Sequence, residues 1–231
     1  AFERASDLMP ADGRPHVGLG DALLLQGRVE PALAAYIRAR GFAPDDPRSA
    51  YAIGRVYARK EQWSLAIAEF RAAIRLNPAF RDARISLLNA LNSRKSFLEA
   101  EREARAHLLV GPADIDARAS LAVALDGLER RAEAVKEYEA ILASNPGVAI
   151  IWGNMGWTQY GAGEYEAAIK SSRKALEIDP TLAYVRFNLG LIYSKQKRVD
   201  EAVKSYQKAI ELRPDYVRAL MNLAEIYNDA K

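Results

Sequence analysis

Three asparagines stand 34 residues apart near the end of the chain: Asn154, Asn188 and Asn222. A carboxamide donates and accepts hydrogen bonds together, so a row of them can pair with successive peptide groups of an extended ligand, whatever its side chains are. Each net hydrogen bond is worth about 1 kcal/mol, whereas micromolar affinity needs roughly 8 kcal/mol. Three asparagines alone do not hold a peptide, and other contacts must contribute.

Four rings in the same stretch are candidates for those contacts: Trp157, Tyr160, Tyr184 and Phe187. Aromatic anchors are common in binding sites, where they receive apolar side chains of the ligand. The alternative is that the rings pack against neighbouring helices, and it stays open, above all for Phe187 and Trp157. For the asparagines, the alternative is descent from a common repeat without a function.

Basic residues form a second candidate contact region in the first part of the chain, with Arg48, Arg55 and Arg59 as its members. These arginines could receive an acidic segment, although charged helix faces are usually only solvated. Acidic residues then follow in the middle of the chain: Asp82, Asp116 and Asp126. The order of residue types is therefore basic, acidic and then aromatic with amide.

The sequence offers few candidate catalytic residues. His16 and His107 are its two histidines, and neither has a nucleophile or ligand partner at motif spacing. There is no cysteine for a disulfide or a thiolate metal site, and no glycine-rich phosphate loop. The net charge of +3 comes from 33 basic and 30 acidic side chains, which does not indicate a nucleic-acid partner. We expect a non-enzyme without cofactor or metal.

A proline repeat indicates the elements that position these side chains. Seven prolines recur at an unbroken interval of 34 residues: Pro10, Pro44, Pro78, Pro112, Pro146, Pro180 and Pro214. Such an interval indicates one supersecondary unit copied in tandem without insertions, with each copy packing on its neighbours. The sequence therefore predicts a solenoid with an elongated binding surface.

Further columns emerge when each proline is numbered 32 in a unit of 34. Position 20 is alanine throughout: Ala32, Ala66, Ala100, Ala134, Ala168 and Ala202. Position 8 is mostly glycine: Gly20, Gly54, Leu88, Ala122, Gly156 and Gly190. Position 24 carries a ring in four units: Tyr36, Phe70, Tyr138 and Tyr206. An invariant small residue at position 20 indicates that two helices cross closely there.

Small, large, small, aromatic and proline residues at these offsets resemble the tetratricopeptide repeat (TPR) family, over essentially the whole chain. The resemblance implies an all-α, right-handed superhelical solenoid of helix-turn-helix repeats. In this family, positions 2, 5, 6, 9, 12 and 13 of the first helix face the concave groove. It therefore implies that the asparagines and the four rings face that groove. The asparagine row is similar to those in the arrays of O-linked N-acetylglucosamine transferase and of the peroxisomal import receptor, which implies peptide-backbone binding.

We expect one continuous array over 1–231, with a first helix at positions 2–14 and a second at 18–30 of each repeat. The full repeats are 13–46, 47–80, 81–114, 115–148, 149–182 and 183–216. Residues 1–12 are expected to form part of a second helix, and 217–231 a first helix only. Departures from the pattern, such as Leu88 and Ala104, predict a less regular middle of the array.

The compartment is not fixed by the sequence, although a cytoplasmic location is favoured over a periplasmic or secreted one. No run of eighteen apolar residues is present that could cross a bilayer, so no membrane insertion is expected. The chain starts at Ala1 without an apolar signal region, so we expect that the natural N-terminus is missing and that the chain is a piece of a longer protein.

These patterns favour a protein-interaction scaffold that binds an extended segment of a partner, mainly through repeats 149–182 and 183–216. Two alternatives stay open. The array could select substrates for an attached enzyme similar to O-linked N-acetylglucosamine transferase, or it could assemble with itself through its uncapped ends. The dicarboxylate clamp of chaperone-binding members is absent, since position 5 lacks the lysine that it requires.

Overall fold

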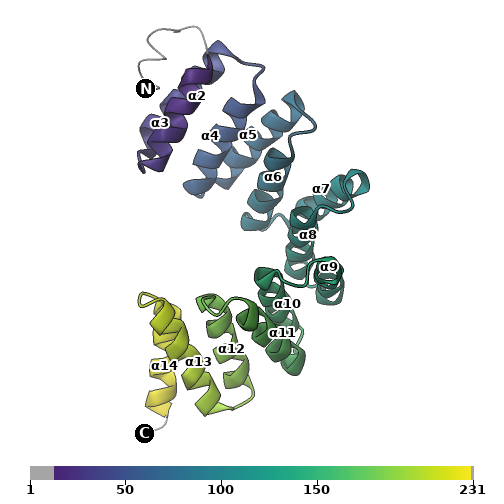
Figure 1. The fold of residues 1–231 in the computed structure, drawn as a ribbon, viewed down its shortest axis with the longest axis vertical. Coiled ribbons are helices and arrows are strands. Elements are labelled where there is room, and N and C mark those ends of the chain that lie inside the picture. Colours follow the sequence, from purple (N-terminus) through teal and green to yellow (C-terminus); the bar gives the residue numbers. More distant parts are fainter. Residues whose placement is uncertain (1–12, 230–231) are drawn as a thin grey trace. The chain divides into compact units, whose positions relative to one another are not determined.

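The computed structural model describes residues 13–229, and these form thirteen α-helices without a strand. The helices are labelled in Figure 1. Their bounds are α2 (Gly13–Leu25), α3 (Val29–Phe42), α4 (Pro47–Arg59), α5 (Trp63–Leu76), α6 (Arg81–Ser93), α7 (Phe97–Val110), α8 (Ile115–Gly127), α9 (Arg131–Ser144), α10 (Ala149–Gly161), α11 (Tyr165–Ile178), α12 (Ala183–Lys195), α13 (Val199–Leu212) and α14 (Val217–Asp229). The prediction of an all-α fold of helix-turn-helix repeats is confirmed.

Each repeat begins with a helix of 13 residues and continues with one of 14, and both begin one residue earlier than expected. At the start of α4, two residues favour this boundary. Pro47 stands in the first turn, where its fixed φ suits a helix and its missing N–H is not needed. Asp46 caps the helix by accepting a hydrogen bond of 3.0 Å from the backbone N–H of Arg48.

The turn between the two helices is the same in every repeat. Position 15 has a positive φ in all six, in residues Gly27, Glu61, Lys95, Glu129, Gly163 and Lys197. The next N–H then donates back to a carbonyl five residues earlier, as from Arg28 to Leu23 and from Arg198 to Tyr193, at 2.9 Å. This hydrogen bond satisfies a terminal helix carbonyl, so the turn ends the first helix at a fixed place.

Close helix crossing explains the columns of small residues. The alanines of position 20 have no exposed surface, and a Cβ atom on Gly54 would come within 2.6 Å of the Phe70 ring. In repeat 81–114 the sizes are exchanged, because Leu88 and Ala104 replace the glycine and the ring, and both are fully buried. Its helices α6 and α7 have the same lengths as the others, but they contact each other less than the two helices of any other full repeat in the described part of the chain.

The chain divides into two compact units, Ala1–Val110 and Gly111–Lys231, called unit 1 and unit 2 below. Within unit 1, buried side chains of α2, α3 and α4 form one core cluster that includes Leu23, Tyr36 and Ile53. Within unit 2, the largest cluster joins α11, α12, α13 and α14 through residues such as Phe187 and Tyr206. A single array over 1–231 stays a prediction, and the partial helix expected in 1–12 lies outside the described residues.

Candidate functional site

Unit 2 contains a cavity of about 390 Å³ that is formed mainly by its successive first helices. Its lining residues are Val123, Asp126, Tyr138, Asn154, Trp157, Thr158, Tyr184, Phe187, Asn188, Tyr216 and Arg218. We call this space the unit 2 cavity. The structure thus brings together five residues that the sequence proposed for peptide binding: Asn154, Asn188, Trp157, Tyr184 and Phe187.

The two asparagines of this cavity, Asn154 and Asn188, are half-buried. Within residues 13–229, no side-chain hydrogen bond of Asn154 or Asn188 is found. Asn222 differs, because its Nδ2 donates to the Tyr206 hydroxyl at 3.3 Å. It lines a separate cavity of about 430 Å³, together with Tyr160. The asparagine row expected from the sequence is therefore divided between two cavities.

The residue at position 24 of the preceding repeat differs between Asn222 and Asn188. Tyr206 occupies position 24 before Asn222, and its hydroxyl also lies 3.3 Å from the Ser194 hydroxyl. Before Asn188, the same position holds Ser172, whose short side chain is buried and makes no hydrogen bond in the described part of the chain. Asn188 therefore has no tyrosine hydroxyl at that position to bind.

The four rings have different roles. Trp157 is 40% exposed and lies 5.4 Å from Tyr160, measured between ring centroids. Phe187 is only 2% exposed and packs on Tyr216 at 5.0 Å, so packing is its first role, although its edge lines the cavity. The Tyr184 hydroxyl is buried without a hydrogen-bond partner among the described residues, and burial raises its pKa.

Two polar groups with raised pKa values lie on the α8 side of the cavity. Burial raises the pKa of Asp126, while Arg131 at 3.6 Å and a hydrogen bond from Thr158 oppose this in part. Burial also raises the pKa of the Tyr138 hydroxyl, and the charge of Asp126 acts in the same direction. Asp126 was expected to make the middle of the array acidic, and in the structure it faces the same cavity as Asn154.

Arg218 on α14 is a cavity residue that the sequence reasoning missed. Its guanidinium carbon lies 5.0 Å from the centroid of the Phe187 ring. The signal was present in the sequence, because Arg218 occupies position 2 of its repeat, one of the groove positions of the family and the position that Tyr184 also holds. The column had not been followed into the incomplete repeat 217–231.

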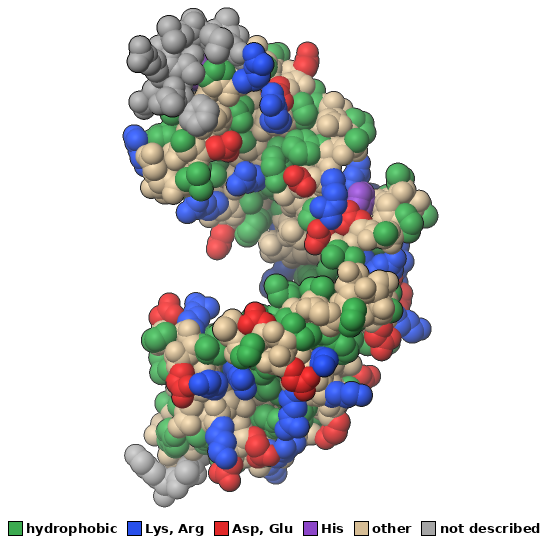
Figure 2. Space-filling model, in the orientation of Figure 1, with side chains coloured by type: hydrophobic (Ala, Val, Ile, Leu, Met, Phe, Trp, Pro, Cys, Tyr) green, Lys and Arg blue, Asp and Glu red, His purple; other side chains and the backbone are tan. Residues whose placement is uncertain are grey.

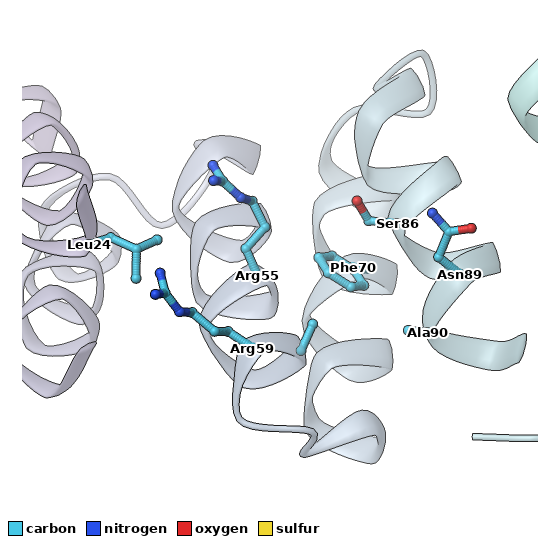
Figure 3. A pocket seen from close by; sticks show the side chains of 8 residues that line it. Leu24, Arg55, Arg59, Phe70, Ser86, Asn89 and Ala90 are labelled. Atoms are coloured by element: carbon cyan, nitrogen blue, oxygen red, sulfur yellow. The ribbon is translucent and has the colours of Figure 1, made fainter. Parts of the chain in front are cut away.

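The predicted basic region lies in unit 1 and is divided as well. Arg55 and Arg59 line a cavity of about 300 Å³ with Leu24, Phe70 and Ser86, and their side chains extend from α4 beside it (Figure 3). We call it the Arg55 cavity. Among the described residues no carboxylate pairs with either arginine. Arg48 instead binds its neighbour Asp46 at 2.7 Å and does not line the cavity, and this hydrogen bond lowers the pKa of Asp46.

Elsewhere the surface is mixed in charge. Figure 2 shows lysine and arginine side chains interspersed with aspartate and glutamate on the visible face of each unit. Of the two histidines, His16 is buried and stacks on Phe42 at 5.1 Å. Within residues 13–229 no group of three or more histidine or acidic side chains could hold a metal ion. None of the helices in this range has the length and hydrophobicity to span a bilayer.

Comparison with known proteins identifies the class. Family models described as tetratricopeptide repeat match residues 1–47, 51–117 and 183–216, and one described as TPR repeat matches 156–197. The chain belongs to the tetratricopeptide repeat family. The fold is typically a non-catalytic scaffold, and membership supports a role in protein–protein interaction. A search of curated proteins finds no match.

Several solved structures are similar to this chain. A tetratricopeptide repeat protein from Parabacteroides merdae has a TM-score of 0.83 at 16% identity, over 98% of this chain and 90% of that one. The Cut9–Hcn1 hetero-tetramer of the APC/C has a TM-score of 0.79 at 16% identity, over 97% of this chain and 44% of that one. YrrB, described as a TPR protein with an unusual peptide-binding site, has a TM-score of 0.55 at 21% identity, over 96% of this chain and 97% of that one. At these identities the likeness shows the fold.

Proposed function

We propose that this protein is an interaction scaffold that binds an extended segment of a partner protein in the unit 2 cavity. The observation that carries the proposal is that Asn154 and Asn188 line one cavity and make no side-chain hydrogen bond within the described residues. A buried polar group normally has a partner, so half-buried amides that lack one are suited to a ligand. Both can donate to and accept from peptide groups.

Trp157 supplies the apolar part of the proposed contact. Covering its exposed 40% removes roughly 100 Å² from water, which is worth about 2–3 kcal/mol. Four hydrogen bonds from two carboxamides add about 4 kcal/mol. The sum stays below the roughly 8 kcal/mol of micromolar binding, so the cavity supports a weak, reversible interaction unless further contacts add to it.

The Arg55 cavity is proposed as a second contact, for an acidic residue of a partner. Arg55 and Arg59 lie one helical turn apart and lack a carboxylate among the described residues, whereas Arg40 and Arg71 of the same unit pair with Glu69 and Glu99. The apolar walls of this cavity, Leu24 and Phe70, would exclude water from such a contact and strengthen it. Arg48 is left out of this proposal because Asp46 already binds it.

Peptide selection tests the main proposal. A random nonapeptide library displayed on phage is selected against the protein and against the Asn154→Ala/Asn188→Ala double variant. The control is Asn228→Ala, which removes an exposed carboxamide of α14 that does not line the cavity. We expect enrichment with the wild type and the control, and its loss with the double variant at unchanged helicity. Equal enrichment with the double variant would place binding elsewhere.

Self-association is a second candidate function, and α14 favours it. Its side chains Val217, Leu220, Met221 and Tyr227 are 43–65% exposed. Tyr227 occupies position 11, which in the repeat before it is the buried Tyr193. We propose that a second copy of the chain covers this face. Light scattering against concentration checks it: the wild type should grow in mass while Met221→Lys stays monomeric, and identical masses would exclude this face.

A further inference from the structure

Arg218 differs from most arginines of unit 2 because it forms no ion pair with a carboxylate of the described residues. Its counterparts pair at 2.6–3.6 Å: Arg118 with Glu137, Arg130 with Glu133, Arg131 with Asp126, Arg198 with Glu201 and Arg213 with Asp215. Within residues 13–229 no such pair involves Arg218, although it lines the unit 2 cavity. Its positive charge is therefore uncompensated at a place where the proposed ligand would lie.

The position of this charge is well defined by its surroundings. The guanidinium group lies over the ring of Phe187, which is 2% exposed and itself packed on Tyr216. A cation over a ring face is attracted by the ring, and its N–H groups at the edge stay available for hydrogen bonds. The ring therefore presents Arg218 to the cavity, where it can bind a carboxylate.

The opposite side of the cavity carries no unpaired charge, because Arg131 pairs with Asp126 at 3.6 Å. Asp126 belongs to α8, while Arg218 belongs to α14, and α10 and α12 lie between them in the order of repeats. Three steps of about 8–10 Å between successive first helices place the two side chains roughly 30 Å apart across the array. An extended chain covers this distance in about nine residues. A peptide that runs along the cavity would thus meet an unpaired charge only at its α14 end, at Arg218.

We infer that the segment bound in the unit 2 cavity carries an acidic side chain at its α14 end, held by Arg218. The inference rests on the proposed function. The charge of Arg218 then selects which sequences bind, while Asn154 and Asn188 bind the backbone regardless of sequence. The ligand is an internal acidic side chain of an extended protein segment.

The test uses the nonapeptides enriched by the selection above, made with blocked termini. In the peptides enriched on the wild-type protein, we expect Asp or Glu at one fixed sequence distance from an apolar residue. Replacing that acid by Gln or Asn, or making Arg218→Ala, should each weaken binding about tenfold, as for one charge-assisted hydrogen bond. The two changes together should weaken it no further. Selection against Arg218→Glu should enrich Lys or Arg at the same distance.

Arg213→Ala is the matched control, because Arg213 lies 5.0 Å from the ring of Tyr216 but pairs with Asp215 and does not line the cavity. It should leave affinity within about twofold. The inference would be overturned if the peptide change and Arg218→Ala weakened binding additively, or if selection against Arg218→Glu still enriched Asp or Glu. Either result would leave the proposed peptide binding intact. A second version of each peptide, with a free C-terminal carboxylate, distinguishes an internal acidic side chain from a chain terminus as the group that Arg218 binds. If only the free terminus tightens binding, the inference is also overturned. A selection that enriches nothing would reject the proposed function and this inference together.

Discussion

Gly54 and Phe70 fit against each other so closely that a Cβ atom on the glycine would come within 2.6 Å of the ring. The two residues belong to the two helices of one repeat, α4 and α5, at the crossing where Ala66 is fully buried. A glycine in mid-helix costs stability in itself, so its use here reflects the close approach of the two helices.

Gly54→Ala should therefore destabilise the protein despite the higher helix propensity of alanine. We expect the free energy of unfolding to fall by about 1–3 kcal/mol, as for other overpacked cores. Urea unfolding followed by circular dichroism measures it. Gly41→Ala is the control, because Gly41 lies in α3 with open space around it, and it should stabilise by up to about 1 kcal/mol. The same sign for both would contradict the packing argument.

The exchanged pair Leu88 and Ala104 predicts compensation between two substitutions. Leu88→Gly alone removes a fully buried side chain and should cost more than about 3 kcal/mol. Adding Ala104→Tyr rebuilds the glycine–ring pair that repeats 13–46, 47–80 and 183–216 have, and it should recover part of this loss. Unfolding of the single and double variants measures the coupling, and a double variant less stable than Leu88→Gly would contradict it.

Position 15 predicts opposite effects for two substitutions in unit 2. Glu129 has a φ of 62° and Gly163 a φ of 80°, in the same turn of successive repeats. Since side chains disfavour this backbone region, Glu129→Gly should stabilise by about 1 kcal/mol and Gly163→Ala destabilise by a similar amount. Thermal unfolding of both variants provides the comparison. A loss of stability with Glu129→Gly would show that its side chain matters more than its backbone.

Asp126 predicts a pH dependence of stability. Because burial raises its pKa in the folded state, the folded protein binds more protons than the unfolded one just above the ordinary aspartate value. The contribution of Asp126 to stability is therefore full below that value and is lost as the pH rises through the raised pKa. A carbon-13 NMR titration of the carboxyl measures the pKa directly, and Asp126→Asn should remove this part of the slope. A pKa below 3.8 would contradict the assignment.

The helices could be predicted from the sequence to within one residue, because a strict period of 34 fixes both turns in every repeat. The one-residue difference at the helix starts recurs in every repeat, with or without a proline such as Pro47 at position 1, so it belongs to the repeat and not to one residue. The size exchange between Leu88 and Ala104 was visible in the sequence as a departure from the pattern, and the two helices of that repeat contact each other less than those of the other full repeats.

Periodicity also predicts which residues share a face, which is why Asn154, Asn188, Trp157, Tyr184 and Phe187 line one cavity. It does not predict which of them other side chains already bind. The hydrogen bond from Asn222 to Tyr206 depends on the residue at position 24 of the preceding repeat. The pairing of Arg48 with Asp46 is a local contact that the column of position 2 does not record.

The most direct test of the central claim is to observe the side-chain amides during binding. An enriched nonapeptide is titrated into nitrogen-15-labelled protein, and the carboxamide signals of Asn154, Asn188 and Asn222 are followed by NMR, each assigned by its alanine variant. We predict large shifts for Asn154 and Asn188 and small ones for Asn222, which Tyr206 already binds. Peptide binding that leaves both Asn154 and Asn188 unchanged would contradict the account.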